Sequence, residues 1–126
     1  MDTKDTKKSI LKGGEFLVKE TNPQDTFIFE DSSDEQLAFI EAANEFIDKR
    51  IAPNYDAIEH KEYEKVITLL EEAGELGLLG MGIPEEYGGM GADFNTDCLV
   101  SEGFGRSQSF SVALAAHVGI GTLPIY

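Results

Sequence analysis

The chain has 126 residues, enough for one domain with a modest core, and its 41% apolar and 27% charged residues exclude a disordered tail. It carries 24 acidic and 10 basic residues, and the resulting net charge of −14 repels phosphate backbones. We therefore expect no nucleic-acid partner and interpret the charge as an acidic surface that aids solubility.

The first third of the chain shows no strong helical pattern before residue 33. Residues 1–12 are mostly polar and predict a flexible N-terminal arm, whereas residues 13–18 fit either an extended segment or one helical turn. Residues 21–31 contain a proline and alternating apolar side chains, so we expect a strap that covers apolar surface.

Residues 34–51 have the spacing of an amphipathic helix. Ser33 and Gln36 stand three residues apart, as in a capping box, which predicts that the helix begins after Ser33. Pro53 is expected to end this helix, because proline disfavours helical geometry at the residue before it. Residues 55–59 can form a short helix beyond it. The apolar positions expected on the inner face are Leu37, Ile40, Ala43, Ile47 and Ile51.

A second amphipathic helix is predicted over residues 62–76. The run of residues 77–91, rich in glycine, ends this helix and reverses the chain toward the next helical pattern. Gly74 and Gly77 weaken the helix end and permit close packing of the backbone. The side chains expected to face the core are Tyr63, Val66, Ile67, Leu70 and Ala73.

Two further helices are predicted near the C-terminus. An Asn-Thr pair can open a helix over residues 95–104, and an alanine-rich helix is predicted over residues 110–118, ended by Gly119 and Gly121. No series of alternating strands and no internal repeat is present. The sequence therefore predicts an all-α fold, an up-and-down bundle of four to six helices formed by residues 13–126, with residues 1–12 as an extended arm.

The single cysteine, Cys98, excludes a disulfide within the chain and is compatible with a reducing compartment. Because it adjoins two apolar residues, we expect a small buried side chain rather than a reactive thiol. No apolar stretch has the length of a signal peptide or a membrane span, so we expect a cytoplasmic protein.

The sequence contains no complete catalytic or metal-binding set. Residues 103–108 begin like a dinucleotide-binding fingerprint, but Gln108 replaces the third glycine and no buried strand precedes them. His60 lies among charged residues and is expected to be solvated, whereas His117 interrupts an apolar segment and is expected to be a core or interface histidine rather than a catalytic one. Neither histidine has the spacing of a metal ligand. Neighbouring carboxylates are expected to lie on solvated helix faces.

Three segments carry a resemblance to the N-terminal domain of acyl-CoA dehydrogenases. Residues 77–91 contain Pro-Glu-Glu-Tyr-Gly-Gly-x-Gly, residues 99–102 read Leu-Val-Ser-Glu, and residues 115–121 read Ala-Ala-His-Val-Gly-Ile-Gly. The likeness extends over about residues 12–126, and the third segment, together with residues 12–17, looks most like the long- and very-long-chain branch.

The resemblance implies a flavin enzyme that desaturates fatty acyl thioesters. Family members have an N-terminal helical domain, a middle β domain and a C-terminal helical bundle, with FAD mainly between the last two. A glutamate in the C-terminal portion removes the α-proton, the β-hydrogen passes as hydride to the flavin, and an electron-transferring flavoprotein receives the electrons. Since residue 126 precedes the expected β domain, the resemblance implies that this chain alone lacks the catalytic base and most FAD contacts. We expect no catalytic residue, no cofactor-binding residue and no bound FAD in it.

The resemblance also implies which residues meet the substrate. By position, Ala113, Ala116, His117 and Ile120 match the wall of the family's acyl pocket, where small side chains leave volume for a fatty chain. The alternative, that the alanines only allow close helix packing, stays open. For the full-length protein the expected partners are fatty acyl-CoA, an electron-transferring flavoprotein and further copies of itself.

A second interpretation belongs to another class of protein. The same helices can form a protein-association module without catalytic function, because a helical domain separated from its neighbours exposes apolar surface that favours association.

Overall fold

The computed structural model describes residues 11, 13–22, 26 and 31–125, and the chain divides into two compact units, Met1–Ser33 and Asp34–Tyr126. Nearly all of the predicted arm and most of the predicted strap lie outside the described residues. In the first unit, Gly13–Leu17 form a 3-10 helix without a buried residue, which confirms the helical alternative for this segment. Lys19 donates a hydrogen bond of 2.6 Å to the carboxylate of Glu15 beside it.

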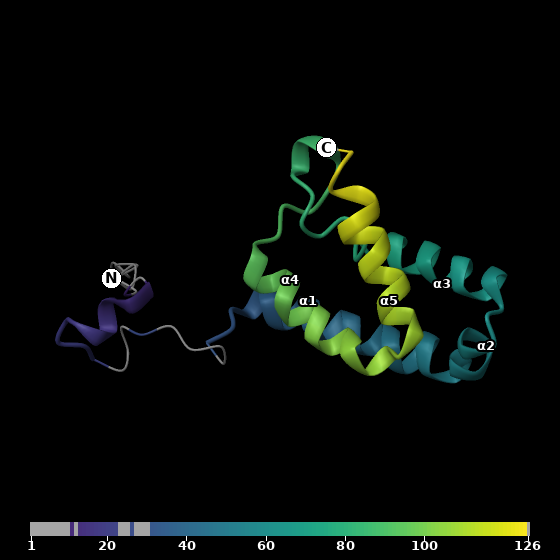
Figure 1. The fold of residues 1–126 in the computed structure, drawn as a ribbon, viewed down its shortest axis with the longest axis horizontal. Coiled ribbons are helices and arrows are strands. Elements are labelled where there is room, and N and C mark those ends of the chain that lie inside the picture. Colours follow the sequence, from purple (N-terminus) through teal and green to yellow (C-terminus); the bar gives the residue numbers. More distant parts are fainter. Residues whose placement is uncertain (1–10, 12, 23–25, 27–30, 126) are drawn as a thin grey trace, which may run out of the picture. The chain divides into compact units, whose positions relative to one another are not determined.

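The second unit is all-α, as the sequence predicts. The described residues 34–125 form five α-helices and no strand (Figure 1). No helix among the described residues is both long and apolar enough to cross a membrane. The helices are α1 (Asp34–Phe46), α2 (Tyr55–Glu59), α3 (Tyr63–Glu75), α4 (Phe94–Phe104) and α5 (Ser109–Ala115).

Two of the predicted helices change their winding toward their C-terminal ends. After α1 the chain forms a π-helix over Ile47–Ile51, which ends where the predicted helix ends, and the tighter 3-10 helix that follows over Ala52–Asn54 contains Pro53. Proline fits there because the first helical positions need no N–H partner. After α5, Ala116–Thr122 form a second π-helix, here named the C-terminal π segment. The predicted end at Gly119 was therefore wrong, since glycine tolerates helical torsion angles and does not stop a helix by itself.

Phe110, near the start of α5, lies at the centre of the core. Its side chain is fully buried, and its ring centroid is 6.3 Å from that of Phe46 and 6.4 Å from that of Phe104. The tilted rings join α1, α4 and α5 in one aromatic cluster. Around it pack the buried side chains of Ala43, Ile47, Ile51, Ile58, Leu69, Ala73, Leu78, Met81, Val100 and Leu114.

The inner face of α3 is narrower than its apolar pattern suggests. Tyr63 and Ile67, both expected to face the core, are 69% and 55% exposed, whereas Leu69 and Ala73 are buried. At 100° per residue, Ile67 lies about 120° around the helix from Ala73. Leu37 of α1 is also exposed, so its predicted place on the inner face was wrong.

The connection between α3 and α4 folds back on itself, as its glycines predict. Gly77 and Gly88 adopt φ angles of +79° and +83°, which L-residues with side chains rarely adopt. The N–H of Ala92 donates a 2.8 Å hydrogen bond to the carbonyl of Met81, and this closes the loop. Residues 78–83 are thereby held beside the core.

The two aliphatic side chains near the middle of α3 offer a test of which face is buried. Leu69→Ala is expected to lower the free energy of unfolding by about 2–5 kcal/mol, because it leaves a cavity in the core. Ile67→Ala, the matched control on the same helix, is expected to change it by less than about 1 kcal/mol. Urea unfolding of both variants measures the difference, and equal losses would contradict the assigned faces.

Candidate functional site

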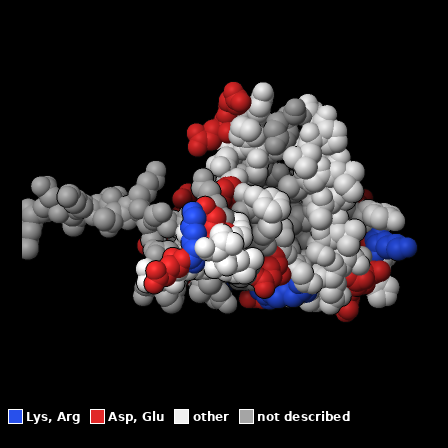
Figure 2. Space-filling model, turned by 60° about the vertical axis from the view of Figure 1, so that its left-hand side comes forward, with Lys and Arg blue, Asp and Glu red and all other residues white. Residues whose placement is uncertain are grey.

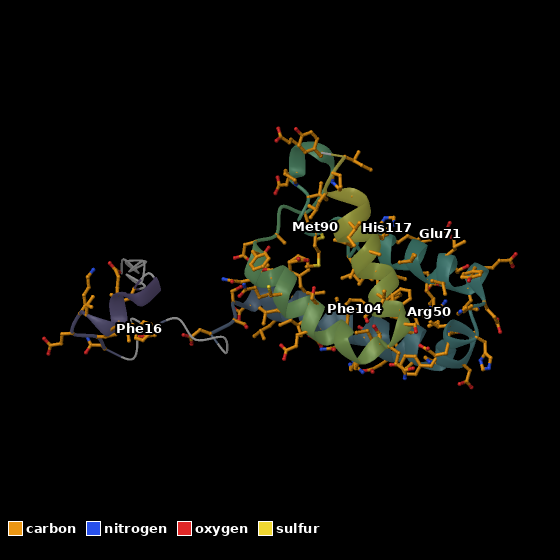
Figure 3. All side chains as sticks on the ribbon, viewed as in Figure 1. Phe16, Arg50, Glu71, Met90, Phe104 and His117 are labelled. Atoms are coloured by element: carbon orange, nitrogen blue, oxygen red, sulfur yellow. The ribbon has the colours of Figure 1, made fainter. Side chains whose placement is uncertain are left out.

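An apolar pocket of about 600 Å³ lies between α4, α5 with the C-terminal π segment, and residues 78–83. Its volume is in the range of pockets that enclose small organic ligands. Figure 3 labels Phe104 on α4 and His117 on the C-terminal π segment. The pocket is lined by Leu78, Met81, Gly82, Ile83, Asp97, Val100, Ser101, Phe104, Gly105, Ser111, Val112, Leu114, Ala115, Ala116, Val118, Gly119, Ile120 and Leu123.

The start of α4 is fixed by Asp93, one residue before the helix. Its Oδ1 accepts hydrogen bonds from the backbone N–H of Thr96 at 2.8 Å and from the Thr96 hydroxyl at 2.6 Å. These two bonds, the hydroxyl's first, hold the pKa of Asp93 below its usual value. The helix was predicted to open at residues 95–96, and the structure places its N-cap at Asp93 instead. This cap orients the first turns of α4, which carry Asp97 and Val100 into the pocket wall.

The turn between α4 and α5 is held by side chains from the preceding helices. The guanidinium of Arg106 forms an ion pair with Asp48 and donates a 3.0 Å hydrogen bond to Oδ1 of Asn44. The hydroxyl of Tyr55 donates a 2.9 Å hydrogen bond to the Arg106 carbonyl. The hydrogen bond from Arg106 lowers the pKa of Asp48. Gln108 follows at φ +52°, and the chain changes direction there into α5.

The first turn of α5 is capped by a carboxylate from α2. Glu59 accepts a 2.8 Å hydrogen bond from the Ser109 hydroxyl and one of 3.0 Å from the Ser109 backbone N–H. Both bonds lower the pKa of Glu59, and the side-chain bond does so more strongly. An anion at a helix N-terminus also interacts favourably with the unpaired N–H groups there. The carboxylate of Glu59 thereby ties the start of α5, which forms part of the pocket wall, to α2.

The structure brings two of the four predicted substrate residues to the pocket. Ala116 and Ile120 line it, whereas Ala113 and His117 are not among the residues of its wall. His117 is exposed, so the prediction of a core histidine was wrong for this chain. No residue of the C-terminal π segment is buried. The interface alternative for His117 stays a prediction.

The exposure of Cys98 corrects a second expectation. Its side chain is exposed, although its two C-terminal neighbours are buried. The buried positions of α4 are Thr96, Leu99, Val100 and Phe104, which recur at intervals of three and four residues. Cys98 falls about 200° from Val100 around this helix and therefore faces away from the core. His60, by contrast, is exposed as predicted, with Nδ1 2.7 Å from the carbonyl of Asp56.

Sequence reasoning missed the part of the wall that comes from outside the last helix. Met81 and Val100 line the pocket. The sequence pattern assigns Met81 only to the connection over residues 77–91 and Val100 only to the helix over residues 95–104, without a role in a site. Val112, on the last helix, also lines the pocket, and its place beside the predicted alanines was the one signal that could have identified it. The contributions of residues 78–83 depend on the folded connection and have no local sequence signal.

The chemistry of the wall suits an apolar group and not a phosphate. Among its lining residues, all of which the structure describes, Asp97 is the single charged side chain and none is lysine, arginine or histidine. FAD carries a diphosphate, so the pocket does not fit that part of the cofactor. Among the described residues no group of His, Cys, Asp and Glu is arranged to hold a metal ion. Figure 2 shows one face, on which red acidic and blue basic side chains lie around a large uncharged area.

Comparison with known proteins identifies relatives of one kind. Residues 33–126 match the family described as acyl-CoA dehydrogenase, N-terminal domain. A probable acyl-CoA dehydrogenase of Bacillus subtilis (strain 168) is 42% identical over 116 residues, which are 92% of this chain and 20% of the relative. The mitochondrial isovaleryl-CoA dehydrogenase of Oryza sativa subsp. japonica is 32% identical over 110 residues, 86% of this chain and 26% of the relative.

A solved structure shares the fold. The crystal structure of an acyl-CoA dehydrogenase from Bacillus anthracis, complexed with FAD, is similar with a TM-score of 0.80 and 44% sequence identity. The match covers 90% of this chain and 20% of that one. The chain thus spans about a fifth of the length of these two bacterial relatives.

The Asp93 cap gives a prediction about pH. A carboxylate whose pKa is lowered by folding stabilises the protein above its unfolded pKa and loses that effect as the pH falls through the folded pKa. Asp93→Ala is therefore expected to lower the thermal unfolding midpoint at pH 7, with a loss that shrinks below about pH 4. Asp93→Asn, the control, keeps an acceptor oxygen but does not titrate. Calorimetry across this range measures both, and a loss from Asp93→Ala that does not depend on pH would contradict the role of the charge.

Proposed function

This chain belongs to the acyl-CoA dehydrogenase family as its N-terminal domain, and from that premise we propose that it supplies one wall of the acyl pocket of an FAD-dependent enzyme. The observation that carries the proposal is the apolar pocket of about 600 Å³, whose wall bears one charged side chain. A fatty chain needs such a surface, because each buried methylene contributes about 0.8 kcal/mol. The thioester and the nucleotide of coenzyme A carry polar groups and belong outside this wall.

The proposed reaction of the longer protein is the α,β-dehydrogenation of an acyl-CoA. FAD, when bound, accepts the two electrons. The proposed task of the described residues is to bind and orient the acyl chain and to exclude water from it. The relatives' names support a coenzyme A thioester as substrate, and one of them is an isovaleryl-CoA dehydrogenase, so the long-chain assignment stays a prediction. We also propose that the longer protein binds FAD, has an electron-transferring flavoprotein as a partner, forms a homo-oligomer and lies in the cytoplasm.

Within the wall, we assign contact with the acyl chain to Ala116 and Ile120. Both line the pocket from the C-terminal π segment, and neither is buried by this chain's own residues. For Ala113 and His117 the assignment stays a prediction. We further propose that the 126 residues alone are catalytically inactive, because the family resemblance places the catalytic glutamate and most FAD contacts in the middle and C-terminal domains.

Ala116 offers the direct test of the wall. In the flavin-loaded longer protein, Ala116→Phe is expected to lower kcat/KM for dodecanoyl-CoA at least about tenfold, because the ring occupies the volume of the chain. For butanoyl-CoA, whose shorter chain reaches less deeply into the pocket, a smaller loss of kcat/KM is expected. Dye-linked oxidation of both thioesters measures the ratio.

Ala42→Phe is the matched control, since Ala42 is an exposed alanine of α1 outside the pocket wall. If Ala116→Phe changes kcat/KM for both thioesters no more than Ala42→Phe does, the proposed contact between this pocket wall and the acyl chain is wrong.

A second candidate function, protein association without catalysis, is favoured by one observation. Val112, Ile120 and Leu123 of the pocket wall are 69%, 82% and 56% exposed, and Ile125 beyond it is 84% exposed. Apolar side chains gathered in this way mark surfaces that bind another molecule.

The association candidate predicts that the 126-residue chain self-associates as its concentration rises. Ile125→Asp is expected to weaken that association, because it places a charge in the apolar contact. Tyr63→Asp, at another exposed apolar position, on α3, is the control and is expected to leave the association unchanged. Sedimentation equilibrium measures both, and a wild-type chain that stays monomeric at high concentration would count against this candidate.

A further inference from the structure

Most glycines of this chain have a structural reason to be glycine. All thirteen lie among the described residues. Four adopt positive φ angles, as Gly77 does at +79°. Others stand where a Cβ would meet neighbouring atoms, and at Gly89 it would lie 2.1 Å from the carbonyl oxygen of Ile83. A side chain at a positive φ is strained, and a Cβ at 2.1 Å would clash. At Gly14 and Gly80 the nearest atoms, at 3.8 and 3.7 Å, would only be in ordinary van der Waals contact with an added Cβ.

Gly82, Gly105 and Gly119 have neither reason. None has a positive φ angle, and a Cβ built at any of them meets no atom within 4 Å. Gly105 has φ −54° and ψ −25°, the ordinary right-handed helical region that alanine prefers. Glycine at such positions costs stability relative to alanine, because the unfolded chain gains conformational freedom. No contact within the domain accounts for this cost.

The three glycines share one property, which is that each lines the apolar pocket. They come from three separate segments: the connection before α4, the turn after α4 and the C-terminal π segment. At each of the three positions an added methyl group would meet no atom of this chain within 4 Å. The other glycines that lack a positive φ have atoms within 4 Å of the added Cβ, and none of them lines the pocket.

We infer that Gly82, Gly105 and Gly119 are specificity-determining residues that keep the pocket wide enough for an acyl group with a branch or a ring. This inference rests on the proposed function, because it names the substrate class of the same pocket. A single unbranched chain leaves gaps beside three open wall positions, and an atom that faces a gap loses its dispersion contacts. A ring or a branch fills that width and regains them.

The test compares two thioesters with the same number of acyl carbons, undecanoyl-CoA and 5-phenylpentanoyl-CoA. In the flavin-loaded longer protein, the triple variant Gly82→Ala, Gly105→Ala, Gly119→Ala is expected to lower kcat/KM for the phenyl substrate at least about tenfold. For undecanoyl-CoA we expect a change of less than about threefold. Thermal unfolding of the same variant is expected to show an equal or higher midpoint.

Gly103→Ala is the matched control, because Gly103 lies on α4 two residues before Gly105 but its added methyl group would face Oδ1 of Asn44 at 3.4 Å. The control is expected to affect both substrates equally. An unchanged ratio of the two substrates, or a lower unfolding midpoint of the triple variant, would overturn the inference while the proposed function stands. A wild-type protein that oxidises neither thioester would instead overturn the proposed function, and the inference with it.

Discussion

The burial of Phe110 against Phe46 and Phe104 is the contact on which the arrangement of the pocket depends. It joins α5 to α1 and α4 at one point of the core, with ring centroids 6.3 and 6.4 Å apart. One face of α5 therefore packs in the core through the buried side chains of Phe110 and Leu114. The other residues of α5 border the pocket or the surface. The pocket is thus a consequence of how α5 leaves the core.

The polar contacts around the α4–α5 turn orient this helix and contribute little net stability. Arg106, Asp48 and Glu59 are exposed, and ion pairs between exposed groups are weak because water screens them and side-chain freedom is lost. Their effect is directional: Glu59 caps α5, and the ion pair of Arg106 with Asp48 fixes the turn that precedes it. The apolar core holds the helices together, and these contacts set the angle at which α5 and the C-terminal π segment leave it.

Much of the fold could be predicted because it depends on local periodicity. The spacing of apolar residues predicted α1 and α3, and the glycines predicted the reversal before α4. The two π-helical segments could not be predicted, because periodicity does not show the hydrogen-bond register in which a helix continues. The exposure of Ile67 and Cys98 depends on which neighbours cover each helix, and a single-helix pattern does not contain that information. Of the pocket wall, the family resemblance identified Ala116 and Ile120, whereas the contribution of Met81 requires the folded connection.

The claim that this domain supplies a wall for an acyl chain is tested most directly by a crystal structure of the longer protein with an acyl-CoA bound. The account predicts that carbon atoms of the acyl chain lie within about 4.5 Å of Ala116 and Ile120, the distance of apolar contact. An acyl chain bound elsewhere, with these two side chains covered by protein or facing water, would contradict it.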